Sequence, residues 1–411
     1  CISKGNVTAN TSKSQVICGG FVGQNGGEIK DCHVNDEAPD KDKYIGVTGG
    51  EYIGGFCGYN RESAEIKGCA SKNCNVKSST WLSSICCGGF VGKNRGTITC
   101  TKDDKGNIDK CEFSGAVNGC IDTEKLLAIG VSSAVAAALV VGVIYYLIAR
   151  YNSKSINNHT NDGSSTMDER DIMNYHNNLD DPINISLLNE GEQIIKKVNS
   201  RYRGALKSFK KSEILKTITL TTIVACIASV ATGVVIEETA KNAYVGGFCG
   251  YNVNKINNSI SESKVEAKSL YNKYNRCGGF VGTNEGVLEN CEAYGKKIEF
   301  KMHAGGYLGG FVGENISNIY NCESLMNVKN GKCTGGFCGY NEGGILKSNS
   351  CGSAETNAKT STNTTRCGGF VGYHKKGMIN GCESNGNATG NEYVGGFCGD
   401  NVAKIMNCKS T

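Results

Sequence analysis

Cysteine is the residue type in this chain with the greatest capacity for chemistry. The 411 residues include 23 cysteines, with 11 in residues 1–120 and 11 in residues 249–408. Thiols at this density act as disulfide partners, metal ligands or nucleophiles. Most stand beside or inside a glycine-rich phrase, or three residues after an aliphatic residue. The candidate disulfide cysteines at these places are Cys18, Cys32, Cys57, Cys69, Cys87, Cys249, Cys277, Cys291, Cys322, Cys338, Cys367, Cys382 and Cys398.

Metal binding and catalysis find little support in the spacing. No Cys-x-x-Cys pair occurs, and His33 and His303 keep no regular distance from the cysteines, so we expect no metal site. The chain lacks His-Glu-x-x-His, Gly-x-Ser-x-Gly and a paired-carboxylate motif. We therefore predict that the protein is not an enzyme and has no catalytic residue and no cofactor. A formal net charge of only +5 also predicts no nucleic-acid binding.

A repeated phrase must position these cysteines. Gly-Gly-Phe-(Val or Cys)-Gly occurs nine times, and within each uninterrupted run successive copies start 26 to 35 residues apart. The apolar residues come in short runs bounded by glycine, which are too short for helices. One Phe and one Ile per unit cannot enclose a core, so each unit must stack on the next. We predict an all-β fold of β-solenoid, or β-helix-like, arrays.

Three details of the repeat add to this prediction. An Asn follows the phrase in eight copies and predicts a hydrogen-bonding ladder, which His374 is expected to interrupt once. The glycines are expected to occupy corners with positive φ. Coils stack about 4.8 Å apart, within the Cα separation of a disulfide, so pairing between adjacent coils is feasible, although spacing leaves the connectivity open.

The repeat resembles the GLUG repeat, a glycine-rich unit of bacterial surface proteins. The resemblance covers residues 1–120 and 244–411 and is carried by phrases such as Gly278-Gly279-Phe280-Val281-Gly282-Thr283-Asn284. This chain differs in placing Cys where small or polar residues usually stand. The resemblance implies a β-helix-like fold and exposure at the cell surface, and it implies no catalytic residue.

Two stretches with few or no charges interrupt the repeats. Residues 126–149 are predicted to form a transmembrane helix, and residues 214–236 a second, weaker one. The predicted fold is therefore two Cys-rich arrays, in residues 1–125 and 237–411, flanking a two-helix transmembrane hairpin. Small residues at every fourth position of both stretches make self-association feasible.

The location follows from thiols and charges. Disulfides persist only outside the reducing cytosol, and residues 150–213 hold no cysteine. Basic residues flank both stretches on the side of residues 150–213, and such flanks stay cytoplasmic. We expect a cell-membrane protein with extracellular arrays and a partly disordered cytoplasmic loop at 150–213, the bilayer being one partner. The first and last residues both resemble the end of a repeat, which suggests a fragment of a longer array or a gene-model fusion.

Further surface chemistry is limited to glycan acceptors. Asn-x-Ser/Thr sequons within the repeats predict candidate glycosylation sites at Asn6, Asn10, Asn257, Asn315, Asn363 and Asn387.

We expect a cell-surface structural or adhesion protein that presents disulfide-stapled solenoid repeats, with a host-cell, matrix or glycan ligand on an exposed face. The alternative is a spacer or carbohydrate-presenting segment of a larger secreted or surface hydrolase. A third hypothesis is transmembrane signalling.

Overall fold

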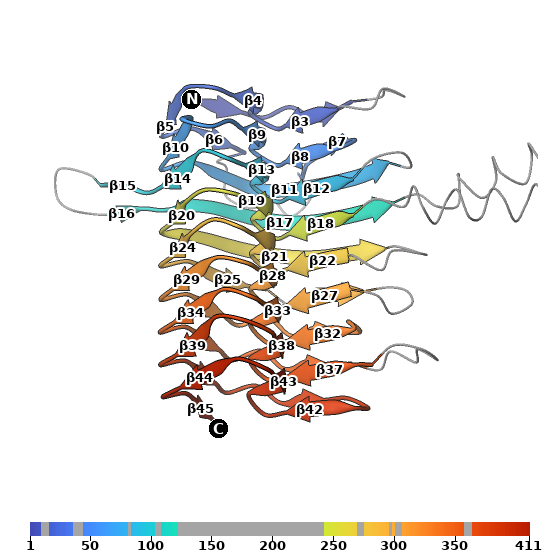
Figure 1. Cartoon of the computed structure of the whole chain (residues 1–411). Coiled ribbons are helices and arrows are strands. Elements are labelled where there is room, and N and C mark those ends of the chain that lie inside the picture. Colours follow the sequence, from blue (N-terminus) through green and yellow to red (C-terminus); the bar gives the residue numbers. More distant parts are fainter. Residues whose placement is uncertain are drawn as a thin grey trace, which may run out of the picture. The chain divides into compact units, whose positions relative to one another are not determined.

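The protein is a stack of β-coils in the computed structural model (Figure 1). Every regular element among the described residues is a strand, and most coils contribute one strand to each of four parallel sheets. The structure describes residues 1–9, 16–35, 44–80, 84–102, 108–121, 242–268, 275–295, 298–300, 306–356 and 364–411.

The glycine phrase joins the first two sheets. Sheet 1 ends each strand on the first glycine of the phrase, and sheet 2 begins each strand directly after the phenylalanine. The sheet 1 strands are β3 (Ile17–Gly19), β8 (Tyr52–Gly54), β12 (Ile85–Gly88), β18 (Ala243–Gly246), β22 (Asn275–Gly278), β27 (Gly306–Gly309), β32 (Cys333–Gly335), β37 (Arg366–Gly368) and β42 (Tyr393–Gly395). The sheet 2 strands are β4 (Val22–Asn25), β9 (Cys57–Asn60), β13 (Val91–Asn94), β19 (Cys249–Asn252), β23 (Val281–Asn284), β28 (Val312–Asn315), β33 (Cys338–Asn341), β38 (Val371–His374) and β43 (Cys398–Asn401).

The aliphatic residue and the cysteine of each repeat lie at the junction of the other two sheets. Sheet 3 comprises β5 (Glu28–Lys30), β10 (Glu65–Lys67), β14 (Thr97–Thr99), β20 (Ile256–Asn257), β24 (Leu288–Glu289), β29 (Asn318–Tyr320), β34 (Gly344–Leu346), β39 (Met378–Asn380) and β44 (Lys404–Met406). Sheet 4 comprises β1 (Ile2–Ser3), β2 (Val7–Thr8), β6 (His33–Val34), β7 (Ile45–Gly49), β11 (Ala70–Thr80), β17 (Cys111–Ile121), β21 (Ser259–Lys268), β25 (Glu292–Tyr294), β26 (Ile298–Phe300), β30 (Glu323–Ser324), β31 (Val328–Lys329), β35 (Asn349–Ser350), β36 (Ala354–Glu355), β40 (Glu383–Ser384), β41 (Ala388–Thr389) and β45 (Lys409–Ser410). Outside these sheets, β15 (Thr101–Lys102) and β16 (Ile108–Asp109) form an antiparallel hairpin.

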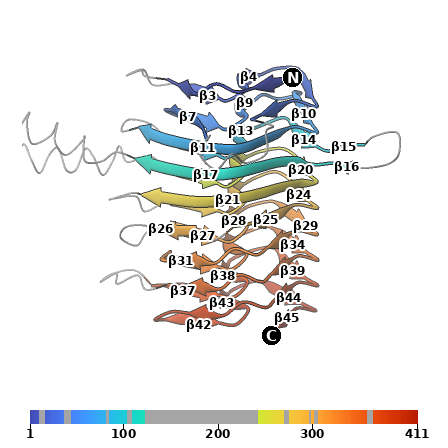
Figure 2. The ribbon, with the colours of Figure 1, turned by 180° about the vertical axis from the view of Figure 1, so that it is seen from behind.

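The predicted pair of arrays is a single solenoid. Coils on the two sides of the long intervening segment pair in parallel, β12 with β18, β13 with β19 and β17 with β21, and the long strands β11, β17 and β21 lie side by side (Figure 2). The phrases at Gly88 and Gly246 stand in register, so this junction has the same hydrogen bonding as any other. Residues 1–125 and 239–411 accordingly form one compact unit.

The prediction of two arrays flanking a two-helix transmembrane hairpin was therefore wrong as a fold class. The described residues contain no helix, and so none of them forms a helix long and apolar enough to cross a membrane. The repeats on either side belong together because their strands complete each other's backbone hydrogen bonds. Residues 126–149, 150–213 and 214–236, including the small-residue stripes, lie outside the described residues.

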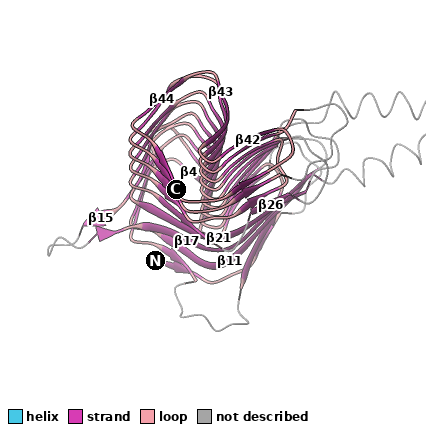
Figure 3. Ribbon diagram, turned by 90° about the horizontal axis from the view of Figure 1, so that it is seen from below, coloured by secondary structure: helices cyan, strands magenta, loops and turns pink. Residues whose placement is uncertain are grey.

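The core contains columns of like side chains stacked along the axis of the solenoid. Figure 3 shows the backbone viewed along that axis. The nine phrase phenylalanines, from Phe21 to Phe397, stack with ring centroids 4.7 to 5.0 Å apart and interplanar angles of 1 to 17°. Beside them, sheet 3 buries a column of Ile and Leu. A strict register is required, because a slip of one residue would turn each strand's apolar side chain to the opposite face.

The phrase glycines are required for a different reason from the predicted one. Their φ angles lie outside the left-handed range, but a Cβ on Gly310 would lie 2.0 Å from the Gly336 carbonyl oxygen of the next coil. Glycine is needed here for close approach of backbone to backbone. The positive-φ corner falls just before the cysteine and is most often an asparagine, as at Asn290 (φ 53°) and Asn321 (φ 49°). Asparagine tolerates this conformation better than most residues.

The predicted asparagine ladder is confirmed. The amide nitrogen of Asn284 donates to Oδ1 of Asn315 (2.9 Å), and the amide nitrogen of Asn315 donates to Oδ1 of Asn341 (2.8 Å). The same bond joins Asn25, Asn60, Asn94, Asn252 and Asn284. The prediction that His374 interrupts the ladder is confirmed on one side only. The buried Nδ1 of His374 lies 3.0 Å from the Asn341 amide nitrogen, because imidazole also offers an acceptor there. The other ring nitrogen, Nε2, lies 3.3 Å from the Lys404 backbone carbonyl oxygen, so the side-chain ladder does not continue to Asn401 on the next coil.

Acid is expected to weaken the solenoid through His374. Burial lowers the pKa of its imidazole, since the charged form would be desolvated. The unfolded chain then takes up the proton at a higher pH than the folded chain. The contribution of neutral His374 to the free energy of unfolding is therefore complete above about pH 6.5 and is lost as the pH falls below that value. Urea unfolding midpoints at about pH 7.5 and about pH 5 measure this loss of stability, and His374→Asn should remove the part of it that depends on the imidazole. An equal loss in both proteins would contradict this account.

Candidate functional site

The register separates the phrase cysteines from one another. In both phrase columns, one or two aliphatic or threonine residues separate each cysteine from the next. The column before the glycine pair reads Cys18, Ile53, Cys87, Val245, Cys277, Leu308, Thr334, Cys367, Val394. The column inside the phrase reads Val22, Cys57, Val91, Cys249, Val281, Val312, Cys338, Val371, Cys398. Cysteines two coils apart are separated by about 9.6 Å, beyond the reach of a disulfide.

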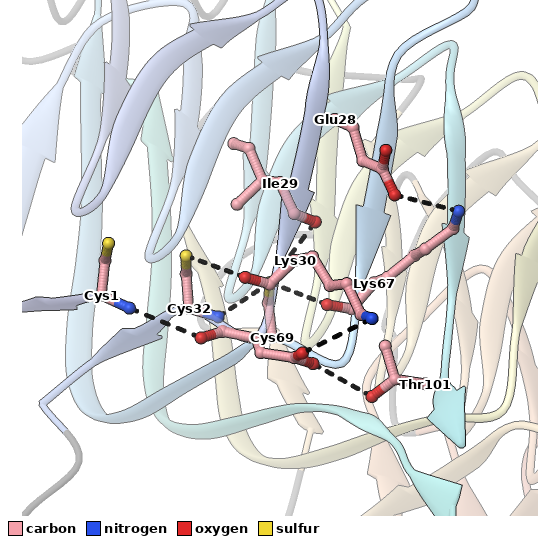
Figure 4. A network of polar contacts seen from close by, with 9 residues as sticks. Cys1, Glu28, Ile29, Lys30, Cys32, Lys67, Cys69 and Thr101 are labelled. Carbon is pink, nitrogen blue, oxygen red and sulfur yellow. Dashed lines mark hydrogen bonds and ion pairs between the residues drawn. The ribbon is translucent and has the colours of Figure 1, made fainter. Parts of the chain in front are cut away.

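A third column brings cysteines onto adjacent coils. It reads Cys1, Cys32, Cys69, Cys111, Ser259, Cys291, Cys322, Ser348, Cys382, Cys408. The Cys32 amide lies 3.4 Å from Sγ of Cys69, and Figure 4 shows this contact with those of Sγ to backbone carbonyls. At Ser348 a hydroxyl replaces the thiol and accepts from the Cys322 amide at 3.1 Å. The thiols of this column thus serve as hydrogen-bonding groups.

Burial makes most of these thiols poor nucleophiles. It raises the pKa of Cys57 and Cys86 to about 12 and that of Cys69 to about 11. Very little thiolate, the reactive species, exists at neutral pH. Cys1 and Cys351 are exposed thiols.

Thiol mapping is expected to reproduce this register. Alkylation of the native protein should modify Cys351 quickly and the phrase cysteines other than Cys398 only after unfolding, because those cysteines are buried. If any bond joins adjacent coils, it should fall in the third column, for example between Cys291 and Cys322. Mass mapping after alkylation in native and denaturing buffer measures both. A bond from Cys57 to Cys249 would contradict the register.

The candidate glycosylation sites differ in exposure. Asn6 and Asn387 are exposed and Asn257 is half-buried, whereas Asn10 and Asn363 lie outside the described residues. Asn315 is fully buried in the asparagine ladder, and its amide nitrogen donates to Asn341 and to the Ser317 carbonyl. The folded coil leaves no room for a glycan on that nitrogen.

Aromatic and cationic side chains converge where sheets 1 and 2 adjoin. Each sheet presents one column of them, and the two columns contact each other. We call this set the tyrosine–cation stripe; it consists of Tyr52, Tyr244, Arg276, Tyr307, Arg366 and Tyr393 from sheet 1 and Tyr59, Lys93, Tyr251, Glu314, Tyr340, Tyr373 and Asp400 from sheet 2. The Tyr307 and Tyr340 rings stack at 4.5 Å, across the two sheets.

Two arginines of the stripe are held by both rings and carboxylates. Arg276 pairs with Glu314 (2.5 Å) and lies over the ring of Tyr244 (5.4 Å). Arg366 pairs with Asp400 (2.7 Å) and lies over Tyr373 (4.4 Å). Such planar guanidinium contacts fix the side chains in place. The stripe is therefore an ordered, half-buried surface that runs along the axis.

Sequence reasoning missed the stripe. The signal was present in the phrase Cys-Gly-Tyr-Asn, whose tyrosines are Tyr59, Tyr251 and Tyr340, each two residues after an inward-facing cysteine. Their partners sit just before the glycine pair, and only the corner between sheets 1 and 2 brings the two sets together.

No group of three or more metal-ligating side chains gathers within the described ranges. No family model, curated protein or solved structure matches this chain.

Proposed function

We propose that this chain is a structural and adhesive protein whose solenoid works at a cell surface and binds a ligand through the tyrosine–cation stripe. The resemblance of its repeats to the GLUG repeat supports the location. The observation that supports the binding role is that the residue types repeat in the interior columns of the solenoid but vary in the stripe on its exterior. Interior columns repeat Phe, Asn and Ile on nearly every coil, while the stripe varies between Tyr, Lys and Arg. Half-buried aromatic and cationic residues at a surface are typical of binding sites.

Because both arrays form one solenoid, the stripe lies on a rigid scaffold. Each coil pairs with the next through four sheets, so an exterior residue is held at a fixed position along the axis. Sites built on strands are more precise than sites on loops. Because both arrays belong to one unit, they lie in the same compartment.

Attachment assays test the proposal. Beads coated with the purified chain should adhere to extracellular matrix or to intact cells, and antibodies to the solenoid should label unpermeabilised cells that express it. A variant with Tyr307→Ala and Tyr340→Ala should adhere less, since it removes a stacked ring pair from the stripe. Equal adhesion of the variant would contradict binding through the stripe, and adhesion by neither protein would favour the alternative, a spacer within a larger hydrolase. Absence of surface labelling would contradict the location.

A further inference from the structure

The tyrosines of the stripe contact each other in pairs. Ring centroids lie between 4.5 and 5.7 Å apart in the pairs Tyr52–Tyr59, Tyr244–Tyr251, Tyr307–Tyr340 and Tyr340–Tyr373. Of these four pairs, Tyr307 and Tyr340 alone have near-parallel rings, with an interplanar angle of 9°, while the others are tilted by 40 to 73°. Carbon atoms in contact approach to about 3.5 to 4 Å, so ring carbons of Tyr307 face ring carbons of Tyr340.

One phenol of each pair is hydrogen-bonded to a carboxylate. The Tyr340 hydroxyl donates to Oε1 of Glu342 at 2.5 Å. The other phenols bonded in this way are those of Tyr52, with Glu51, and Tyr251, with Glu285. Burial and the bond to Glu342 raise the pKa of Tyr340, so its phenol keeps its proton at neutral pH. Each pair therefore contains a protonated phenol with a proton acceptor in place.

This arrangement favours one-electron oxidation of the phenol. Loss of an electron makes the tyrosine hydroxyl a strong acid, and the proton must reach a base before a neutral tyrosyl radical can form. Hydrogen bonds from Tyr340 and Lys375 lower the pKa of Glu342 to about 2, but its carboxylate is still a far stronger base than the oxidised phenol. The buried ring of Tyr340 then holds the radical against the second phenol, that of Tyr307.

We propose that Tyr307 and Tyr340 are a modification site, at which a peroxide acting through a haem peroxidase joins the two rings as dityrosine, with Glu342 accepting the Tyr340 proton. The peroxide takes one electron and one proton from each phenol and is reduced to two molecules of water. The two radicals form a carbon–carbon bond between ring positions ortho to the hydroxyls, and each of these carbons passes its hydrogen to its phenol oxygen.

The new bond would link adjacent coils. Tyr307 lies on β27, whose register partner β32 belongs to the same coil as β33, the strand of Tyr340. A covalent link between neighbouring coils is what the phrase cysteines cannot supply, because their register separates them by two coils or more. This crosslink does not depend on the proposed ligand binding.

Treatment of the dilute full chain with a haem peroxidase and hydrogen peroxide tests the site. Mass spectrometry of peptides from the monomer fraction should find Tyr307 joined to Tyr340, with the loss of two hydrogen atoms, as the main dityrosine linkage. Tyr307→Phe and Tyr340→Phe keep both rings but should each abolish this linkage, because a phenyl ring forms no phenoxyl radical. Tyr373→Phe is the matched control and should leave the linkage unchanged, since its ring is tilted by 70° from that of Tyr340.

Glu342→Gln tests the base. Glutamine keeps a hydrogen-bond acceptor but takes up no proton, so the initial rate of dityrosine fluorescence should fall at least about tenfold. Unchanged urea midpoints establish that the variants fold. Dityrosine only between molecules, a linkage spread evenly over all tyrosines including the exposed Tyr44, a bond from Tyr307 to its register partner Cys333, or no dityrosine would each overturn the proposal. An initial rate for Glu342→Gln equal to that of the unaltered chain would likewise contradict it.

Discussion

Replacing Gly309 with alanine is expected to lower the free energy of unfolding by about 3 kcal/mol or more. The added Cβ would lie 1.9 Å from the Val312 carbonyl oxygen and 2.6 Å from that of Phe337. Neither atom can rotate away, because both belong to backbone, and the Phe337 carbonyl accepts from the amides of Phe311 and Val312. Relief of the clash must therefore break the pairing of adjacent coils.

Gly27→Ala is the matched control for this substitution. A Cβ on Gly27 meets nothing within 4 Å, so this change should alter stability by less than about 1 kcal/mol. Urea unfolding followed by circular dichroism measures both variants. Similar midpoints for the two would show that the phrase glycines are not needed for close approach.

Replacing Asn315 with leucine is expected to cost about 2 to 5 kcal/mol. The change removes the acceptor of the Asn284 amide and the donor to Asn341, at 2.9 and 2.8 Å, and all three side chains are fully buried. Leucine is of similar size, so the loss reflects unpaired polar groups rather than a cavity.

Asn318→Leu serves as the control, since Asn318 is exposed three residues further along the same coil. Its substitution should shift the urea midpoint little. The ladder account would be contradicted if the two leucine variants unfolded at the same urea concentration, or if Asn315→Leu were as stable as the unaltered chain.

The repeat period and register were the predictable part of this fold. Successive Phe residues could stack only if strands paired in parallel, and the Asn after each phrase then had to form a ladder. The alternation of Cys57 with Val91 was also visible in the sequence, and it already separated the phrase cysteines once the phrases were aligned in register.

The unpredicted features depend on three-dimensional proximity. The sequence separates Gly88 from Gly246 by a long stretch with its own strong apolar pattern, which suggested two bodies where pairing makes one. The role of Gly310 depends on how closely one coil approaches the next. Likewise, Tyr307 and Tyr340 meet only through the angle between two sheets, which no local pattern encodes.

Cleavage of the chain between the two arrays tests the central claim most directly. A site for a specific protease, inserted within residues 126–238, allows the intact protein to be cut after folding, in buffer that contains reductant. Because coils on the two sides pair through β12 and β18, β13 and β19, and β17 and β21, the fragments should elute together on size-exclusion chromatography and separate only in denaturant. Separation of the fragments in native buffer would contradict a single continuous solenoid.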